Sequence, residues 1–156
     1  MSAVFTWKIH DGADLPHVLF DTNVVLDLFL KREPFLSESA AAIGAMVSLK
    51  PRSFIATSTV TDLHYVLRKA LGSDTAAHDA IEEVLNLFDL ADTIAFDIYS
   101  AHESKAPDFE DSVIASITSR MMLDYLVTRN VKDYKLLPVH AVTPHEFLKL
   151  IRGPSQ

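Results

Sequence analysis

Acidic side chains stand at several places where an apolar run of the sequence ends or the next helix begins. The first of them, Asp21, directly follows the apolar run Val18–Phe20. The polar residues in such positions are Asp21, Asp62, Asp108, Asp111, Asn130 and Asp133. Carboxylates gathered in one pocket repel each other and raise each other's pKa, and a hard divalent cation with oxygen ligands relieves that repulsion. The residue types therefore predict a site for Mg²⁺ or Mn²⁺.

Each acid also has a purely structural interpretation as part of a helix cap. Asp21 could accept a backbone N–H at a helix start. Asp62 stands three residues after Thr59, which is the spacing of a capping box. Asp111 stands in the same relation to Asp108. Capping alone does not call for acids at four strand-proximal turns, so the acids taken together favour a metal site.

The elements that would position these acids follow from the apolar pattern. Strands are predicted at residues 18–20, 54–57, 93–98, 125–128 and 138–142. Helices are predicted after residue 21, from caps at Ser37, Thr59, Ser73 and Asp108, and from Thr143-Pro144 to about residue 151. This alternation predicts an α/β fold, a three-layer α/β/α sandwich around a mainly parallel five-stranded sheet. Because the strand-to-helix turns of a parallel sheet share one edge, the acids should converge in one crevice.

Composition narrows the function classes. The chain has 156 residues, 49% hydrophobic and 22% charged, which is typical of one globular domain. It contains no cysteine, and this excludes disulfides, thiolate zinc sites and a cysteine nucleophile. A net charge of -7 argues against tight binding of long nucleic acid through bulk charge alone. Carboxylates gathered around a cation would account for part of that charge.

Common catalytic and nucleotide-binding motifs are absent from the sequence. Its four glycines form neither G-x-G-x-x-G nor G-x-x-x-x-G-K-[ST], and its seven histidines form no H-E-x-x-H. A nucleophile elbow, G-x-S-x-G, is also missing. Phosphotransfer through an aspartyl phosphate on Asp21 stays open. Haloacid-dehalogenase-like enzymes, however, place a second acid two residues later, where this chain has Asn23.

The ends of the chain carry no predicted chemistry. We expect residues 1–16 to be an N-terminal extension, residues 17–151 to form the domain and residues 152–156 to be a tail. The first sixteen residues lack a continuous apolar segment, so no signal peptide is predicted. No span approaches the roughly 20 apolar residues of a membrane helix. We therefore expect a cytoplasmic protein with no membrane contact.

Four segments of the chain form a recognisable set: Phe20-Asp21-Thr22-Asn23, Asp108-Phe109-Glu110-Asp111-Ser112-Val113-Ile114-Ala115, residues 126–134 and residues 142–148. Together they resemble the PIN-domain family of VapC-like metal-dependent ribonucleases. Their order and spacing match from about residue 17 to residue 151. The resemblance implies a metal-dependent ribonuclease on a compact α/β/α fold, often the toxin of a bacterial toxin–antitoxin pair.

The resemblance also implies roles for individual residues. Asp21 matches the family's first acid and Asp111 its third, while the second, usually Glu, is Asp62 here. An amide, Asn130, stands where many members have a fourth acid, and Asp133 is close by. The metal ligands implied are Asp21, Asp62, Asp108, Asp111 and Asp133, and the auxiliary polar residues are Thr22, Asn23, Thr128 and Asn130.

A mechanism follows from these assignments. One or two ions held by Asp21, Asp62 and Asp111 would lower the pKa of a water and stabilise charge on the scissile phosphate. RNA phosphate contacts are expected from Arg129, Lys132 and Arg68, with Lys31, Arg32, Lys69 and Lys105 nearby.

The family also implies an antitoxin and a homodimer as partners. The alternative is a catalytically weak scaffold that binds nucleic acid or protein. In this scheme Asp27 is an ordinary helix acid.

Overall fold

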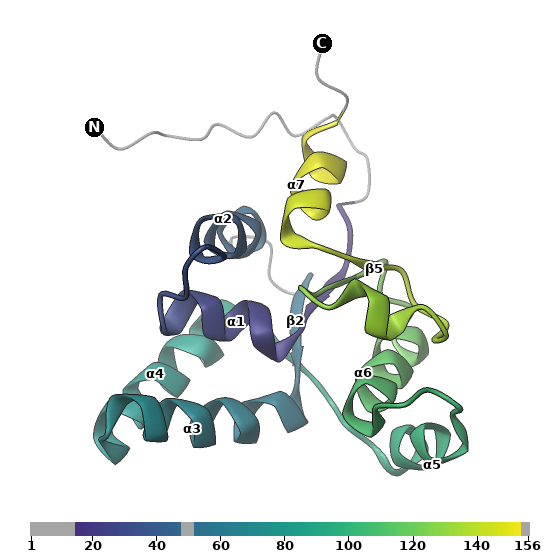
Figure 1. Cartoon of the computed structure of the whole chain (residues 1–156), viewed down its shortest axis with the longest axis horizontal. Helices are drawn as coiled ribbons and strands as arrows, with labels where there is room; N and C mark the ends of the chain where they lie inside the picture. Colours follow the sequence, from purple (N-terminus) through teal and green to yellow (C-terminus); the bar gives the residue numbers. More distant parts are fainter. Residues whose placement is uncertain (1–14, 48–51, 154–156) are drawn as a thin grey trace.

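A five-stranded parallel sheet lies at the centre of the protein (Figure 1). The computed structural model describes residues 15–47 and 52–153. Its strands are β1 (Val18–Phe20), β2 (Ser53–Ala56), β3 (Asp89–Ala91), β4 (Tyr125–Val127) and β5 (Ala141–Val142). They pair in the order β3-β2-β1-β4-β5, and every pairing is parallel. The predicted parallel five-stranded sheet is confirmed.

Helices cover both faces of this sheet. One face is covered by α1 (Thr22–Phe29), α2 (Leu36–Met46), α3 (Thr57–Leu71), α4 (Asp74–Leu87) and α7 (Pro144–Arg152). The other is covered by α5 (Ala95–Glu103), α6 (Phe109–Arg120) and the 3₁₀ helix η1 (Val131–Tyr134). In Figure 1, α5 and α6 lie on the opposite side of the sheet from α1 and α3. The α/β/α sandwich is therefore as predicted.

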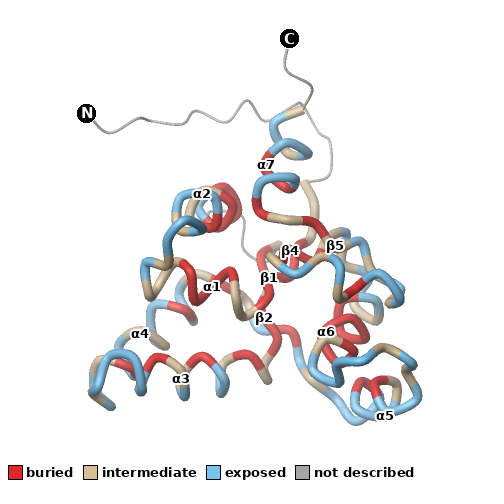
Figure 2. Tube along the Cα trace, in the orientation of Figure 1, coloured by how far each residue is buried: buried red, intermediate tan, exposed pale blue. Residues whose placement is uncertain are grey.

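Two hydrophobic cores result, one on each face of the sheet. Val18 and Phe20 face the core beneath α1 to α4 and α7, whereas Leu19 faces the core beneath α5 and α6. All three side chains are fully buried, and the buried stretches in Figure 2 run through the strands. A strand apolar on both faces is what a sheet covered on both sides requires. The β1 segment is thus fixed from both faces, and Asp21 follows it directly.

The predicted strand at residues 93–98 is wrong. The third strand is Asp89–Ala91, and residues 95–103 form α5. Asp97 explains the difference, because its buried side chain accepts a hydrogen bond from the Ile94 N–H at the start of that helix (2.9 Å). Arg120 of α6 pairs with the same carboxylate (2.8 Å). The Asp97–Arg120 pair fixes α5 on α6, and a partner 23 residues away leaves no local signal.

Two predicted helix starts are also wrong. Helix α2 begins at Leu36 after Phe35, so Ser37 lies inside the helix and does not cap it. Helix α3 begins at Thr57, directly after β2, so Thr59 lies in its first turn. Asp62 is consequently not the third residue of a capping box. The caps predicted at Ser73 and Thr143 are confirmed by side-chain hydrogen bonds to Ala76 N and Glu146 N.

The chain ends lie largely outside the described residues. Most of the predicted N-terminal extension and most of the predicted tail fall there, as do residues 48–51. Within the described ranges, no helix is long and apolar enough to cross a membrane.

Candidate active site

Asp21 stands at the junction of β1 and α1, near the middle of the sheet. Its backbone N–H donates to Val127 O of the neighbouring β4 (2.9 Å), and its side-chain Oδ1 accepts from Thr22 N at the start of α1 (2.8 Å). The residue is only 7% exposed. Asp21 is therefore both the N-cap of α1 and a buried acid at the carboxyl edge of the sheet.

The second carboxylate oxygen of Asp21 accepts hydrogen bonds from three side chains. Thr128 Oγ1 donates to Oδ2 at 2.8 Å, Tyr134 OH at 3.1 Å and Asn23 Nδ2 at 3.3 Å. The Thr128 hydroxyl also accepts from Asn130 N (3.1 Å). Thr128 and Tyr134, which are 107 and 113 positions from Asp21, are thus brought to its carboxylate by the pairing of β1 with β4.

Asp111 lies opposite Asp21, in the first turn of α6. Its backbone N–H donates to the N-cap Asp108 Oδ1 (2.9 Å), so Asp108 does act as a helix cap. Its Oδ1 lies 3.0 Å from Tyr134 OH, the same hydroxyl that contacts Asp21. A phenol carries one proton and can donate to only one carboxylate at a time. The two acids therefore meet at a single hydroxyl, and a second proton is needed if both contacts are hydrogen bonds.

The electrostatic environment of the pocket disfavours the ionised forms of Asp21 and Asp111. Burial raises the pKa of Asp21, against the hydrogen bonds from Thr128 and Thr22 that lower it. For Asp111, partial burial and the nearby charges of Asp108, Asp21 and Asp133 together raise the pKa to about 6, although the Tyr134 hydrogen bond opposes this. Burial and the two carboxylates also raise the pKa of Tyr134 well above its usual value. The pocket has an excess of negative charge that a cation would compensate.

Glu110 belongs to the same acidic group. Its pKa is raised first by partial burial and then by the carboxylates of Asp62, Asp21, Asp108 and Asp111. Glu110 lies inside the Asp108–Asp111 motif, but it is not among the predicted site residues. Its carboxylate is exposed on α6 and lies near that of Asp62 on α3.

The structure does not bring all the predicted acids into direct contact. Asp62 is exposed on α3, and among the described residues its charge acts on Glu110. Asp133, in η1, is half-buried and acts on Asp111. Asn130 is exposed beside Thr128. Thr22 turns to the hydroxyl of Thr59 (3.3 Å).

The donor chemistry of this pocket fits a hard divalent cation in type. Asp21 and Asp111 supply carboxylate oxygens to one point, and their raised pKa values mark uncompensated negative charge. Across residues 15–47 and 52–153, however, no three acidic or histidine side chains are arranged together to hold a metal ion. Two carboxylates are therefore in place, and a third ligand from Glu110 or Asp62 requires a side-chain movement.

The site residue that the sequence analysis missed is Tyr134. Its side chain is 1% exposed, and its hydroxyl is the link between Asp21 and Asp111. A tyrosine at the end of the segment Arg129–Tyr134 gives no signal by type or spacing. Only the turn of η1, which directs this side chain inward beneath β4, reveals its role.

The basic residues predicted to contact RNA have different surroundings. Arg68 pairs with Asp74 (2.8 Å) near the far end of α3, and Lys132 is exposed in η1. Arg129 pairs with Asp27 (2.8 Å), whose side chain is fully buried. The interpretation of Asp27 as an ordinary helix acid is therefore wrong, since no isolated charge is left buried without a partner.

Comparisons with known proteins agree with this architecture. The family model described as PIN domain matches residues 17–132. No curated protein sequence matches the chain.

Solved structures of low sequence identity share the fold. VapBC2 from Rickettsia felis, bound to a promoter DNA fragment, has 17% identity and a TM-score of 0.64 over 81% of this chain and 97% of that chain. A toxin–antitoxin complex from Klebsiella pneumoniae has 24% identity and a TM-score of 0.61, with the same coverage. The sarcin-ricin-loop-cleaving toxin VapC20 of Mycobacterium tuberculosis has 13% identity and a TM-score of 0.56 over 70% of this chain and 86% of that chain. Because the family model covers well over half of its length, the chain belongs to the PIN-domain family.

Proposed function

We propose that the protein is a metal-dependent endoribonuclease that hydrolyses RNA phosphodiester bonds. The observation that carries the proposal is the meeting of Asp21 and Asp111 at the Tyr134 hydroxyl, at the carboxyl edge of a parallel sheet. Ligands of open α/β folds bind at that edge. Two buried or half-buried carboxylates with raised pKa values are costly for the fold, and they are explained by a ligand that compensates their charge.

Asp21 and Asp111 would hold Mg²⁺ or Mn²⁺, with Glu110 or Asp62 completing the ligand set. When bound, the ion would supply an activated water at neutral pH and would neutralise charge on the scissile phosphate. Thr128 and Asn23 orient the Asp21 carboxylate, because both donate to its Oδ2. Tyr134 holds Asp21 and Asp111 at a fixed separation. This chemistry needs no 2′-hydroxyl, so the preference for RNA rests on the surrounding surface and on the likeness to VapC20.

A toxin role with an antitoxin partner is part of the proposal. The support is the fold shared with the VapBC2 and Klebsiella pneumoniae complexes, in which a toxin is bound to its antitoxin. An antitoxin that inhibits this site would place a basic side chain among the acids. A homodimer remains a prediction from the family resemblance.

The test is RNA cleavage by the purified protein and its Asp21→Asn variant, with Mg²⁺, Mn²⁺ or EDTA. We expect wild type to cleave only with metal, and the variant to lose on the order of a hundredfold or more because a ligand is gone. Asp79→Asn, an exposed acid on α4, is the matched control and should cleave as wild type does. Equal cleavage by Asp21→Asn would refute the assignment.

A second candidate is a binding module without catalysis. The observation that favours it is the exposed position of Asp62, because no third carboxylate joins Asp21 and Asp111 in the described residues. Calorimetry with Mn²⁺ separates the two functions. Absence of heat at millimolar Mn²⁺, together with retained RNA or protein binding, would favour the module.

A further inference from the structure

A buried ion pair lies directly beside the acidic pocket. The Asp27 side chain is fully buried, and its Oδ2 is 2.8 Å from Arg129 Nε and accepts a hydrogen bond from Ser39 Oγ (2.9 Å). The guanidinium carbon of Arg129 lies 4.0 Å from the centroid of the Phe35 ring. Arg129 is therefore fixed at its Nε edge by a carboxylate and on one face by an aromatic ring.

Helix α1 holds this arginine at two points one turn apart. Asn23 Oδ1 accepts from the backbone Arg129 N–H (3.2 Å), and Asp27, four residues later on α1, binds the Arg129 side chain. Asn23 also donates to Asp21. The residue before Arg129 is Thr128, which donates to Asp21 as well. The position of Arg129 is thus coupled directly to the acid at the centre of the site.

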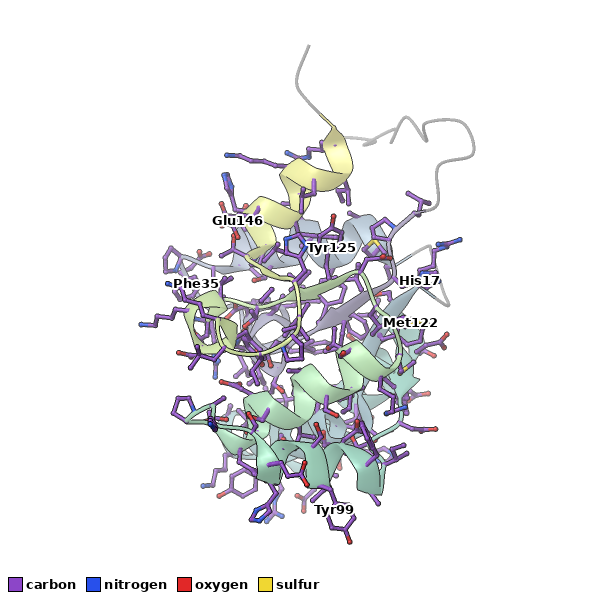
Figure 3. The ribbon with its side chains drawn as sticks, turned by 90° about the vertical axis from the view of Figure 1, so that its right-hand side faces the viewer. His17, Phe35, Tyr99, Met122, Tyr125 and Glu146 are labelled. Atoms are coloured by element: carbon purple, nitrogen blue, oxygen red, sulfur yellow. The ribbon has the colours of Figure 1, made fainter. Side chains whose placement is uncertain are left out.

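The remaining edge of the guanidinium has no partner among the residues that the structure describes. Within residues 15–47 and 52–153, neither Nη atom of Arg129 has a hydrogen bond, and the side chain is 25% exposed. In Figure 3, Phe35, against which Arg129 packs, lies on the opposite side of the molecule from His17 and Met122, which precede β1 and β4. Arg129, which follows β4 directly after Thr128, therefore lies at the same carboxyl end of the sheet as Asp21. A free planar pair of N–H groups on an immobile arginine matches the oxygens of a phosphate.

We propose that Arg129 is a phosphate-binding residue that positions the substrate backbone next to the scissile bond. This inference rests on the proposed function, because it assigns the ligand of that same site. A nucleic-acid strand has phosphates on both sides of the cleaved one, so a cation at the same end of the sheet as the acids would be placed to bind one of them. A carboxylate from a protein would satisfy the same edge, but the surrounding acids offer it no further attraction, whereas RNA also gains the metal at the neighbouring phosphate. The cradle of Asp27, Ser39 and Phe35 holds the guanidinium in place before substrate arrives, which lowers the entropy lost on binding.

The chain offers a closely matched control for this arginine. Arg120 also pairs at 2.8 Å with a fully buried aspartate, Asp97, and its side chain is also 25% exposed. It lies at the opposite end of α6 from Asp111, about two and a half turns away. Loss of either arginine leaves a buried carboxylate unpaired, so both variants measure the structural cost of breaking such a pair. Only the loss of Arg129 should affect the substrate.

The experiment measures binding of a short single-stranded oligoribonucleotide in EDTA, and its cleavage with Mn²⁺, for wild type, Arg129→Ala, Arg129→Lys and Arg120→Ala. We expect Arg129→Ala to raise Kd and KM about tenfold and to lower the salt dependence of binding by about one phosphate contact. Arg129→Lys should not restore either value, because a lysine cannot pair with Asp27 and present a fork together. Arg120→Ala should leave Kd and KM unchanged.

Phe35→Leu is the variant that keeps both charges. Phe35 is 40% exposed, so its replacement leaves the fold intact while it frees one face of the guanidinium. A rise in KM of a few-fold would support the cradle. Wild-type Kd and KM in Arg129→Ala, or equal losses in Arg129→Ala and Arg120→Ala, would overturn the inference even when wild type cleaves RNA. Absence of cleavage by wild type would instead contradict the proposed function.

Discussion

At the residue scale, the Tyr134 hydroxyl is what sets the geometry of the acids. It lies 3.1 Å from an oxygen of Asp21 and 3.0 Å from one of Asp111, and its side chain is buried under β4. Each carboxylate oxygen has more than one lone pair, so the hydroxyl can stay in place when a cation binds between the two acids. Tyr134 therefore links the two acids through one hydroxyl in the absence of a metal.

Replacing Tyr134 with Phe should separate this positioning role from metal ligation. The ring still fills the core, so the fold should be retained, but the two carboxylates lose the one hydroxyl proton that they share, a hydrogen bond of about 1 kcal/mol. We expect weaker Mn²⁺ binding in calorimetry and a several-fold lower kcat with unchanged KM. A variant with wild-type Mn²⁺ affinity and kcat would show that the hydroxyl contributes nothing to the site.

The ionised side chain of Asp111 should destabilise the folded protein, although the proposed metal site requires it. Its pKa is raised from the ordinary 3.8 to about 6, so the folded protein binds this proton more tightly than the unfolded chain. The contribution of Asp111 is thus most favourable at acidic pH and is lost as pH rises from about 4 to about 6. Allowing for solvent screening, Asp111→Asn should raise the free energy of unfolding by about 1 kcal/mol at pH 7.

Thermal unfolding across pH 4 to 7, without metal, tests this expectation. The Tm of Asp111→Asn should exceed that of wild type by an amount that grows as pH rises. In a separate assay, the same variant should have lost metal-dependent cleavage. A variant that is less stable than wild type at pH 7 would contradict it.

At the scale of the element, local chemistry decided which predictions were correct. Helix α7 was predicted closely because Thr143, Pro144 and Glu146 form its cap within four residues. The third strand was misplaced because Asp97 joins a helix only through Arg120, 23 residues along the chain. The start of α3 is misplaced because Thr59 is a common N-cap residue by type, but the helix begins at Thr57 and the Thr59 hydroxyl accepts from Thr22 instead of capping it.

The junction between α3 and α4 depends on a single glycine. Gly72 ends α3 with φ 64, and a Cβ there would meet no other atom within 4 Å. Gly72→Ala should therefore cost about 1 kcal/mol through the backbone alone. Gly44→Ala, in the exposed interior of α2, should instead stabilise by up to about 1 kcal/mol. Chemical denaturation of the two variants checks both signs, and equal effects would contradict the backbone explanation.

At the scale of the whole molecule, the site forms only when β1 pairs with β4 and both α6 and η1 pack beside them. Asp21 and Thr128 directly follow β1 and β4, whereas Asp111 lies in α6 and Tyr134 in η1. The sequence predicted that acids would converge at this edge because parallel strands end together. It did not predict Tyr134, Glu110 or the buried role of Asp27, because each depends on which way a side chain points after the helices are packed.

A divalent cation should therefore stabilise the folded chain as a whole. At 100 times its Kd, a ligand that binds only the folded state adds about 2.7 kcal/mol. For a chain of this size, Mn²⁺ should then raise Tm by roughly 5–10 °C. The rise should disappear in Asp21→Asn, and an unchanged wild-type Tm at saturating Mn²⁺ would mean that the pocket holds no ion.

The two contacts that α1 makes with Arg129 also restrict how this protein can change in length. Asn23 and Asp27 are four residues apart, and one inserted residue between them would turn Asp27 by about 100° around the helix axis. The aspartate would then point away from Arg129 and leave its charge buried alone. Insertions and deletions should thus be excluded from α1 among the relatives that keep this pair, while the exposed turn around Ser73 can accept them. Where such a relative does differ in α1 length, we expect Asp27 and Arg129 to have been replaced together.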